Sequence, residues 1–275
     1  NGKVSDIDLC DKIILIGTNP RNECPVLNAR IRKAWLRGAD IQLIGEKTDL
    51  TYDYKFLGND KNSIEKLSSK NFEKFRGKAI VVLGQGAIVG EGGEEVLQAT
   101  KRLTEKMKAK LLVLHVAASR VGALDLGFTH SDGITRALGQ AEVIYNMGMD
   151  EYDLPKDCYV IYQGSHGDNG AHRADLILPS ACYTEESGIF VNTEGRSQMA
   201  FRANFPPGNA KENWAIIRAL AGKLGLNMAF NSLSELRTCL INEYPLLGNL
   251  GNIVESDWKK STFSGFSTNS TLKNY

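Results

Sequence analysis

The chain contains 275 residues, of which 42% are hydrophobic and 24% are charged, and its formal net charge at pH 7 is +1. These values are ordinary for a globular protein, and they provide no strongly basic surface for binding DNA, RNA or an anionic membrane. No apolar run reaches the roughly 20 residues that a membrane-spanning helix requires.

The first part of the chain predicts a strand, a helix and a second strand. Residues Lys12–Ile16 form a continuous apolar run, as expected for a buried parallel strand. From Val26 onward apolar residues recur at helical spacing, Gly38 ends this helix, and Ile41–Ile44 supplies the next strand. Residues 51–69 are polar and rich in lysine, and we predict a loop and a surface helix for them.

The same alternation continues from residue 78 through the middle of the chain. A strand at Ala79–Leu83 leads into a glycine-rich turn and then a helix at Glu94–Lys108. Further elements are predicted in chain order: a strand at Leu111–Val116, a loop at Ala118–Phe128, a short helix at Gly133–Gly139, and strands at Glu142–Tyr145, Cys158–Tyr162 and Leu176–Leu178. The last strand is a short apolar run that we expect to be buried, and Pro179 is expected to end it.

Strands that alternate with helices over about 190 residues predict a doubly wound α/β fold, with mainly parallel sheets and helices on both faces. We divide the chain into a first α/β lobe at 1–75, a second α/β lobe at 76–205 and a C-terminal region at 206–275, which combines short helices with an extended tail.

In the C-terminal region, Asn209 is expected to cap a helix that carries Glu212 at its third position. Residues Ser232–Asn242 predict one more helix. The stretch after Pro245 is rich in serine, asparagine and glycine, and it is too polar to build a core of its own.

The turn Gly84–Gly90 follows a strand and precedes a helix, which is where a dinucleotide-binding fingerprint belongs. Its third glycine falls one position late, with Val89 in the expected place, and the next strand ends without the acidic residue that would bind a ribose. We therefore interpret this segment as a strand-to-helix turn rather than a site for NAD or FAD.

Two other loops, Gly17–Pro20 and Met147–Asp150, also follow predicted strands. The carboxyl ends of strands are the usual ligand positions in open α/β sheets, yet short loops also favour glycine, asparagine and proline for geometric reasons. Both interpretations, a small-molecule site and a plain turn, stay open.

Several side chains have the chemistry of metal ligands or catalytic groups without the spacing of a known site. The candidates are His166 and His172 with Cys158 and Cys182 for a metal, Ser165, His166 and Cys182 for nucleophilic catalysis, and Glu185 with Glu186 for acid–base chemistry. The histidines match no zinc pattern, no nucleophile elbow surrounds the serine or the cysteine, and adjacent carboxylates in a turn point apart. We therefore predict no catalytic, cofactor-binding or metal-binding residue in this chain.

The stretch Ala174–Arg196, ADLILPSACYTEESGIFVNTEGR, resembles a signature of molybdopterin oxidoreductases of the form AD, two apolar residues, LP, and then E-x-x-G-x-F-x-N-T-E-G-R. Further similarity runs from about Asp11 to Leu226 and includes IILIGTNPR, KAIVVLGQGA and PPGNAKENWAIIRAL. Within that family, NARIRK, ALDLG, DLPKD and VNTEGR resemble the C-terminal part of the largest iron–sulfur subunit of respiratory complex I, NADH:ubiquinone oxidoreductase.

This resemblance implies a non-catalytic, structural part of the complex I peripheral arm. The iron–sulfur-binding N-terminal half would be either a separate polypeptide of a split subunit or a region outside this sequence. The resemblance implies no cofactor bound by this chain, iron–sulfur clusters and FMN on partner chains, and contacts with that half and with other peripheral-arm subunits. It implies neither nucleic-acid binding nor direct membrane insertion.

The implied location is the matrix side of the mitochondrial inner membrane, with the cytoplasmic face of a bacterial plasma membrane as the alternative. Two other functions are weighed against the structural one. The first is a molybdopterin-binding oxidoreductase fragment completed by a partner chain, and the second is a free-standing nucleotide-binding module.

Overall fold

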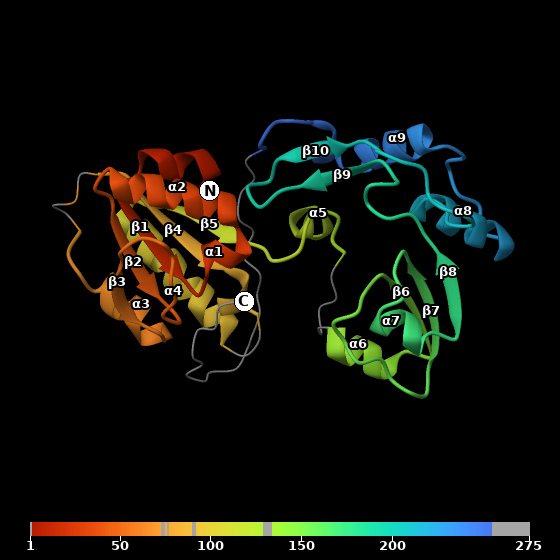
Figure 1. Cartoon of the computed structure of the whole chain (residues 1–275), viewed down its shortest axis with the longest axis horizontal. Helices are drawn as coiled ribbons and strands as arrows, with labels where there is room; N and C mark the ends of the chain where they lie inside the picture. Colours follow the sequence, from red (N-terminus) through yellow and green to blue (C-terminus); the bar gives the residue numbers. More distant parts are fainter. Residues whose placement is uncertain (1, 73–74, 76, 90–91, 129–133, 255–275) are drawn as a thin grey trace. The chain divides into compact units, whose positions relative to one another are not determined.

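The computed structural model describes residues 2–72, 75, 77–89, 92–128 and 134–254 (Figure 1). The contacts divide the chain into two compact units, which differ from the three predicted regions. Among the described residues, unit 1 contains those within 2–121, 192–196 and 253–254, and unit 2 contains those within 122–191 and 197–252. Within the described ranges, no helix is both long and apolar enough to cross a membrane.

Unit 1 is built on a five-stranded sheet with the order β3-β2-β1-β4-β5, in which every pairing is parallel. Its strands are β1 (Lys12–Ile16), β2 (Asp40–Ile44), β3 (Lys55–Gly58), β4 (Ala79–Gly84) and β5 (Lys110–Leu114). The two central strands, β1 and β4, are almost entirely buried. The predicted α/β class with a parallel sheet is therefore confirmed for this unit.

Helices cover both faces of this sheet, and alternate residues of β1 point to each face. Ile13 and Leu15 pack under the 3₁₀ helix η1 (Val4–Leu9) and helix α2 (Pro25–Leu36). Ile14 and Ile16 pack under α3 (Lys61–Ser68) and α4 (Gly93–Met107) on the opposite face. This two-sided burial explains why β1 is a continuous apolar run rather than an alternating one.

The segments at residues 51–69 and 118–128 each contain an element that was not predicted. The stretch predicted as loop and helix contains β3, a four-residue edge strand whose two apolar residues, Phe56 and Leu57, are too short a run to indicate a strand. Helix α5 (Arg120–Asp125) begins in this unit and lies inside the stretch predicted as a loop.

Unit 2 contains a three-stranded parallel sheet with the order β6-β7-β8 and a two-stranded antiparallel hairpin. The sheet strands are β6 (Val143–Met147), β7 (Tyr159–Gly164) and β8 (Leu176–Pro179), and the hairpin strands are β9 (Gly188–Val191) and β10 (Ser197–Ala200). The remaining elements are α6 (Ile134–Gln140), α7 (Asn169–Arg173), α8 (Asn213–Lys223), α9 (Leu233–Glu243) and the 3₁₀ helix η3 (Pro245–Gly248).

The prediction of a buried strand at Leu176–Leu178 is wrong about burial, although the strand exists. Leu176 is 42% exposed and Ile177 is 53% exposed. Pro179 still pairs with Gly164 at the end of the ladder. The apolar run therefore marks a strand whose faces are not covered by the described residues of unit 2.

The first predicted C-terminal helix begins later than expected. Asn209 does not cap it; α8 starts at Asn213, with Glu212 at the N-cap position. The backbone N–H of Asn213 donates to the carboxylate of Glu186 at 3.0 Å. A side chain from a distant turn therefore satisfies the first helical N–H, and no pattern within the helix sequence indicates it. The second helix, α9, is confirmed, and its Ser232 side chain caps it.

The turn Asn192–Arg196 is grouped with unit 1 and is closed by hydrogen bonds. Its Asn192 Oδ1 accepts from the N–H groups of Glu194 and Arg196 at 3.1 and 2.9 Å, and Gly195 has a φ of +82°, a conformation that favours glycine. The N–H of Val4 donates to Glu194 Oε2 at 2.8 Å. The turn is thereby attached to the first element of unit 1.

Replacing fully buried Ile14 by Asp tests the two-sided burial of β1. The change would place a charge without a partner between β1 and the helices below it, so the free energy of unfolding is expected to fall by about 3–5 kcal/mol. Val26→Asp, at an exposed position of α2, is the control and should change it by less than about 0.5 kcal/mol. Denaturant unfolding followed by circular dichroism measures both, and equal stability of the two variants would contradict this packing.

Candidate functional site

The usual ligand position in unit 1 lies between the carboxyl ends of β1 and β4, because the strand order reverses there. In this protein the loops that follow the two strands touch each other. A Cβ atom added to Gly84 would overlap the backbone oxygen of Gly17, and one added to Gly17 would overlap the side chain of Ala87. Thr18 between them is fully buried. The chain itself therefore fills this position.

The loop after β1 is held by the carboxylate of Glu23, which lies in the short helix α1 (Pro20–Glu23). The hydroxyl of Thr18 donates to Glu23 Oε2 at 2.7 Å, and the N–H of Asn19 donates to Glu23 Oε1 at 2.5 Å. Donors in a strand-to-helix loop are the groups that bind phosphate in nucleotide-binding folds. Here a side chain of the protein supplies the anion.

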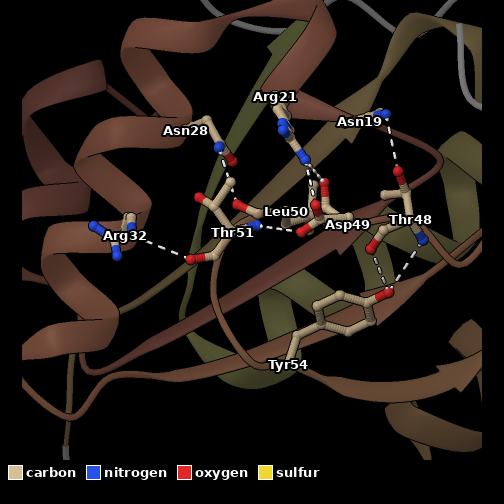
Figure 2. A network of polar contacts seen from close by, with 9 residues as sticks. All are labelled: Asn19, Arg21, Asn28, Arg32, Thr48, Asp49, Leu50, Thr51 and Tyr54. Atoms are coloured by element: carbon tan, nitrogen blue, oxygen red, sulfur yellow. Dashed lines mark hydrogen bonds and ion pairs between the residues drawn. The ribbon is translucent and has the colours of Figure 1, made fainter.

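The loop after β2 is hydrogen-bonded to the loop after β1, as Figure 2 shows. The side-chain amide of Asn19 donates to Thr48 Oγ1 at 3.1 Å. The hydroxyl of Tyr54 accepts from the N–H of Thr48 at 3.1 Å and donates to its carbonyl oxygen at 2.7 Å. This part of the loop is therefore fixed against the end of β1.

Two arginines near this loop, which are natural anion ligands, are already paired with it (Figure 2). Arg21 forms an ion pair with the carboxylate of Asp49, and Arg32 donates to the carbonyl oxygen of Thr51 at 3.1 Å. The hydrogen bond from the N–H of Thr51, together with Arg21, lowers the pKa of Asp49. Both guanidinium groups therefore hold the loop in place.

The loop Met147–Asp150 at the end of β6 is closed in a similar way. The Asn146 side chain accepts from the N–H of Met149 and donates to its carbonyl oxygen, both at 2.9 Å. Asp150 Oδ1 accepts from the N–H of Gly170, at the start of α7, at 2.7 Å. As with Glu23, a carboxylate of the protein, here Asp150, accepts from a backbone N–H that could otherwise bind an anion.

A cavity of about 420 Å³ lies in unit 2, at the carboxyl ends of β7 and β8. It brings together four of the side chains that the sequence singles out: Ser165, His166, Cys182 and Glu185. The rest of the lining consists of Gly164, Pro179, Ser180, Thr184, Pro207, Asn209 and Ala210.

The polar groups around this cavity are bonded mainly to one another and to the backbone. Ser165 Oγ lies 2.9 Å from Nδ1 of His166, and the hydroxyl of Tyr162, whose pKa is raised by burial, donates to the His166 carbonyl oxygen at 3.1 Å. Within the described residues, no carboxylate bonds the His166 ring, as a Ser-His-Asp triad would require. Glu185 instead accepts from the N–H of Cys182 at 3.0 Å.

The other candidates lie apart from this cavity. Cys158 is buried, with its thiol donating to a backbone carbonyl oxygen at 3.2 Å, and His172 is exposed on α7. Glu186 bonds Asn213 at the start of α8, so the two adjacent glutamates serve different partners. In the described part of the chain, no three His, Cys, Asp or Glu side chains gather in a metal-binding arrangement.

The turn after β4 also differs from a dinucleotide-binding loop. Gln85–Ala87 form a 3₁₀ turn, and α4 begins only at Gly93, whose added Cβ would overlap the carbonyl oxygen of Ile88. The first turn of α4 therefore packs against protein. Gly90, the last residue of the predicted turn, lies outside the described residues.

Sequence reasoning did not identify Glu23 and Asp150 as the groups that close the two loops. Neither carboxylate has a characteristic spacing, and each becomes significant only through the donor that the fold brings to it. The single available signal was an acidic residue within or just after each strand-end loop.

Comparison with known proteins gives a family match and several relatives. The family model described as molybdopterin oxidoreductase matches residues 1–223. The chain is 36% identical over 270 residues to the mitochondrial NADH-ubiquinone oxidoreductase 78 kDa subunit of Neurospora crassa. It is 38% identical over 274 residues to an NADH-quinone oxidoreductase subunit of Rickettsia bellii, and 39% identical over 251 residues to the 78 kDa subunit of Candida albicans.

These alignments cover 93%, 94% and 86% of this chain, respectively. They cover only 36%, 40% and 34% of the relatives. The chain therefore spans little more than a third of the length of the curated relatives that it matches.

The variant Glu23→Gln tests whether the internal carboxylate holds the loop after β1. The amide can accept only with its oxygen, so either the Thr18 hydroxyl or the Asn19 N–H loses its partner, and the free energy of unfolding should fall by about 1–2 kcal/mol. Glu65→Gln, which alters a half-exposed carboxylate 4.0 Å from Arg102 on α4, should change it by less than about 0.5 kcal/mol. Thermal unfolding compares the two, and an equal effect would show that Glu23 has no special role.

Proposed function

Because the chain belongs to the molybdopterin oxidoreductase family, and its relatives are NADH-quinone and NADH-ubiquinone oxidoreductase subunits, we propose that it is a non-catalytic structural and assembly part of the peripheral arm of respiratory complex I. That enzyme couples electron transfer from NADH to ubiquinone with proton pumping. In this proposal the chain contributes folded mass and contact surface, and its own residues make or break no bond.

The observation that carries this proposal is the closure of the strand-end loops by the protein's own groups. Glu23 bonds the donors after β1, and Asp150 bonds the N–H of Gly170. The loops after β1 and β4, where the strand order reverses, are in direct contact through Gly17 and Gly84. These described residues do not fit a pterin dinucleotide, whose phosphates need such donors and such space. We therefore derive no chemistry through that cofactor.

The proposed partners are those that the resemblance to the largest iron–sulfur subunit of complex I implies. The iron–sulfur-binding N-terminal half of the subunit and other peripheral-arm subunits would contact this chain, and the iron–sulfur clusters and FMN would be bound by partner chains. The chain would bind no cofactor, no nucleic acid and no membrane directly. Its place would be the matrix side of the mitochondrial inner membrane or the cytoplasmic face of a bacterial plasma membrane.

One observation favours the alternative, a molybdopterin-binding fragment completed by a partner chain. The cavity of about 420 Å³ at the ends of β7 and β8 has the size of a small-molecule site. Its lining is mostly polar and, within the described residues, contains a single acidic group that is already bonded to its own turn. The cavity therefore supports the alternative less strongly than the closed loops support the structural role.

Native gel electrophoresis of gently solubilised membranes tests the proposal directly. An antibody to this chain and an in-gel NADH dehydrogenase stain should label the same large band. The excised band should contain iron but less than about one-tenth equivalent of molybdenum or tungsten per complex. Migration of the chain as a small species would overturn the proposal, and stoichiometric molybdenum or tungsten would establish the alternative.

The double variant His166→Ala with Cys182→Ala separates the two functions by activity. Since the structural role assigns no reaction to the cavity, NADH:quinone turnover per assembled complex is expected to stay within about twofold of the unmodified enzyme; twofold corresponds to only about 0.4 kcal/mol of barrier height. Turnover is normalised to the FMN content of the purified complex. A loss of more than tenfold at normal assembly would favour chemistry in the cavity.

A further inference from the structure

In the small sheet of unit 2, the two faces of β6 and β7 differ strongly in burial, whereas β8 is exposed on both faces. Register pairs Val143 with Tyr159, and Tyr145 with Ile161, so these side chains share one face. Leu176 of β8 pairs with Ile161 and joins them. Residues one position along each strand, such as Ile144 and Val160, point to the opposite face.

The opposite face is covered over β6 and β7, but not over the edge strand β8, where Ile177 is 53% exposed. Ile144 and Val160 form a buried cluster with Cys158. Leu138 of α6 and Leu154 of the loop before β7 pack against this cluster. Val160 has no exposed surface.

The first face, which we call the open face (Val143, Tyr145, Met147, Tyr159, Ile161, Leu176 and Leu178), is mostly uncovered. Val143 is 59% exposed, Met147 48% and Tyr159 47%. At the carboxyl end of β7, α8 lies against this face: the side chain of buried Gln163 donates to Asn213 Oδ1 of α8 at 2.6 Å.

An open apolar face is unusual on a parallel sheet, because such sheets are normally covered on both sides. The same protein follows that rule in unit 1, where the helices η1, α2, α3 and α4 bury both faces of the larger sheet. Contiguous exposed apolar residues with a charged rim are typical of an interaction surface. Three charged residues, Glu142, Lys156 and Asp157, are exposed next to the amino ends of β6 and β7, and we take them as the charged rim of this surface.

We propose that the open face is the docking surface for a helical layer of the longer polypeptide found in the relatives. Those relatives are about two and a half to three times as long as the part that this chain matches. The docked segment would be amphipathic, with apolar residues against Val143, Tyr159 and Leu176 and polar residues at the charged rim. This inference rests on the proposed function, because it takes the iron–sulfur half of the subunit as the source of the layer.

Adjacent residues of β8 provide a matched pair of variants. Leu176 lies on the open face and Ile177 on the opposite one, and both side chains are substantially exposed in this chain. Both Leu176→Asp and Ile177→Asp should therefore leave the melting temperature of the free chain nearly unchanged. Leu176→Asp should lower the fraction assembled into the NADH-oxidising band at least about tenfold, because docking would bury its charge. Ile177→Asp should lower it less than about twofold.

The outcomes separate failure of this inference from failure of the proposed function. If the unmodified chain is absent from the NADH-oxidising band, the proposed function fails. If the unmodified chain assembles and the two variants assemble equally, only the open-face inference fails. Loss of the melting transition of Leu176→Asp in the free chain would also overturn it, because the face would then be covered within this chain.

Photo-crosslinking identifies the occupant without relying on stability. Tyr159 is replaced by p-benzoylphenylalanine in the assembled complex, and crosslinked peptides are sequenced by mass spectrometry. The expected adduct is a helical segment of the iron–sulfur half of the subunit. An adduct to another subunit, to this chain itself, or no adduct in a complex that assembles would overturn the proposed occupant.

Discussion

A parallel β-sheet normally has both faces covered by other elements, and this requirement determines where the apolar residues of this protein lie. In unit 1 that need is met internally: alternate residues of β1 enter two separate clusters, one with Leu27 and Ile31 of α2 and the other with Ile64 of α3 and Leu103 of α4. Each cluster consists of apolar side chains that lose nearly all their exposed surface on folding, which is the main favourable contribution to stability. Unit 2 meets the same need only in part: one face of β6 and β7 is covered, while the other face of these strands and both faces of β8 keep exposed apolar side chains.

This asymmetry is relevant to function. A parallel sheet that is to bind a small molecule needs free donors and free space at its strand ends. In both units those donors are bonded to internal carboxylates, Glu23 and Asp150. A charged side chain in that position stabilises the loop by the same interaction that a bound phosphate would provide. The strand ends therefore contribute to rigidity, while the exposed apolar surface lies on the face of a sheet.

The sequence predicted the elements whose pattern is set by burial, namely β1, β2, β4, α2 and α4. It missed β3 because the two apolar residues of this four-residue edge strand are too short a run. It missed β10 because that strand is defined by its pairing with β9. It misjudged Leu176–Leu178 for a related reason. An apolar run indicates that the strand needs cover, and the sequence of one chain does not say whether that cover belongs to the same chain. The cavity was also beyond prediction, because Ser165 and Cys182 meet there only through the parallel pairing of β7 with β8.

The segment that most resembles the family signature has a structural explanation. Asn192 closes the turn, Gly195 permits its left-handed conformation, and Glu194, 8% exposed, accepts from the N–H of Val4. Thr193 donates to the carbonyl oxygen of Val113 in β5. These contacts bind the turn to the first element and to the edge strand of unit 1. Resemblance to an oxidoreductase family in such a segment is therefore evidence for shared architecture, and activity must be argued separately from the strand-end loops.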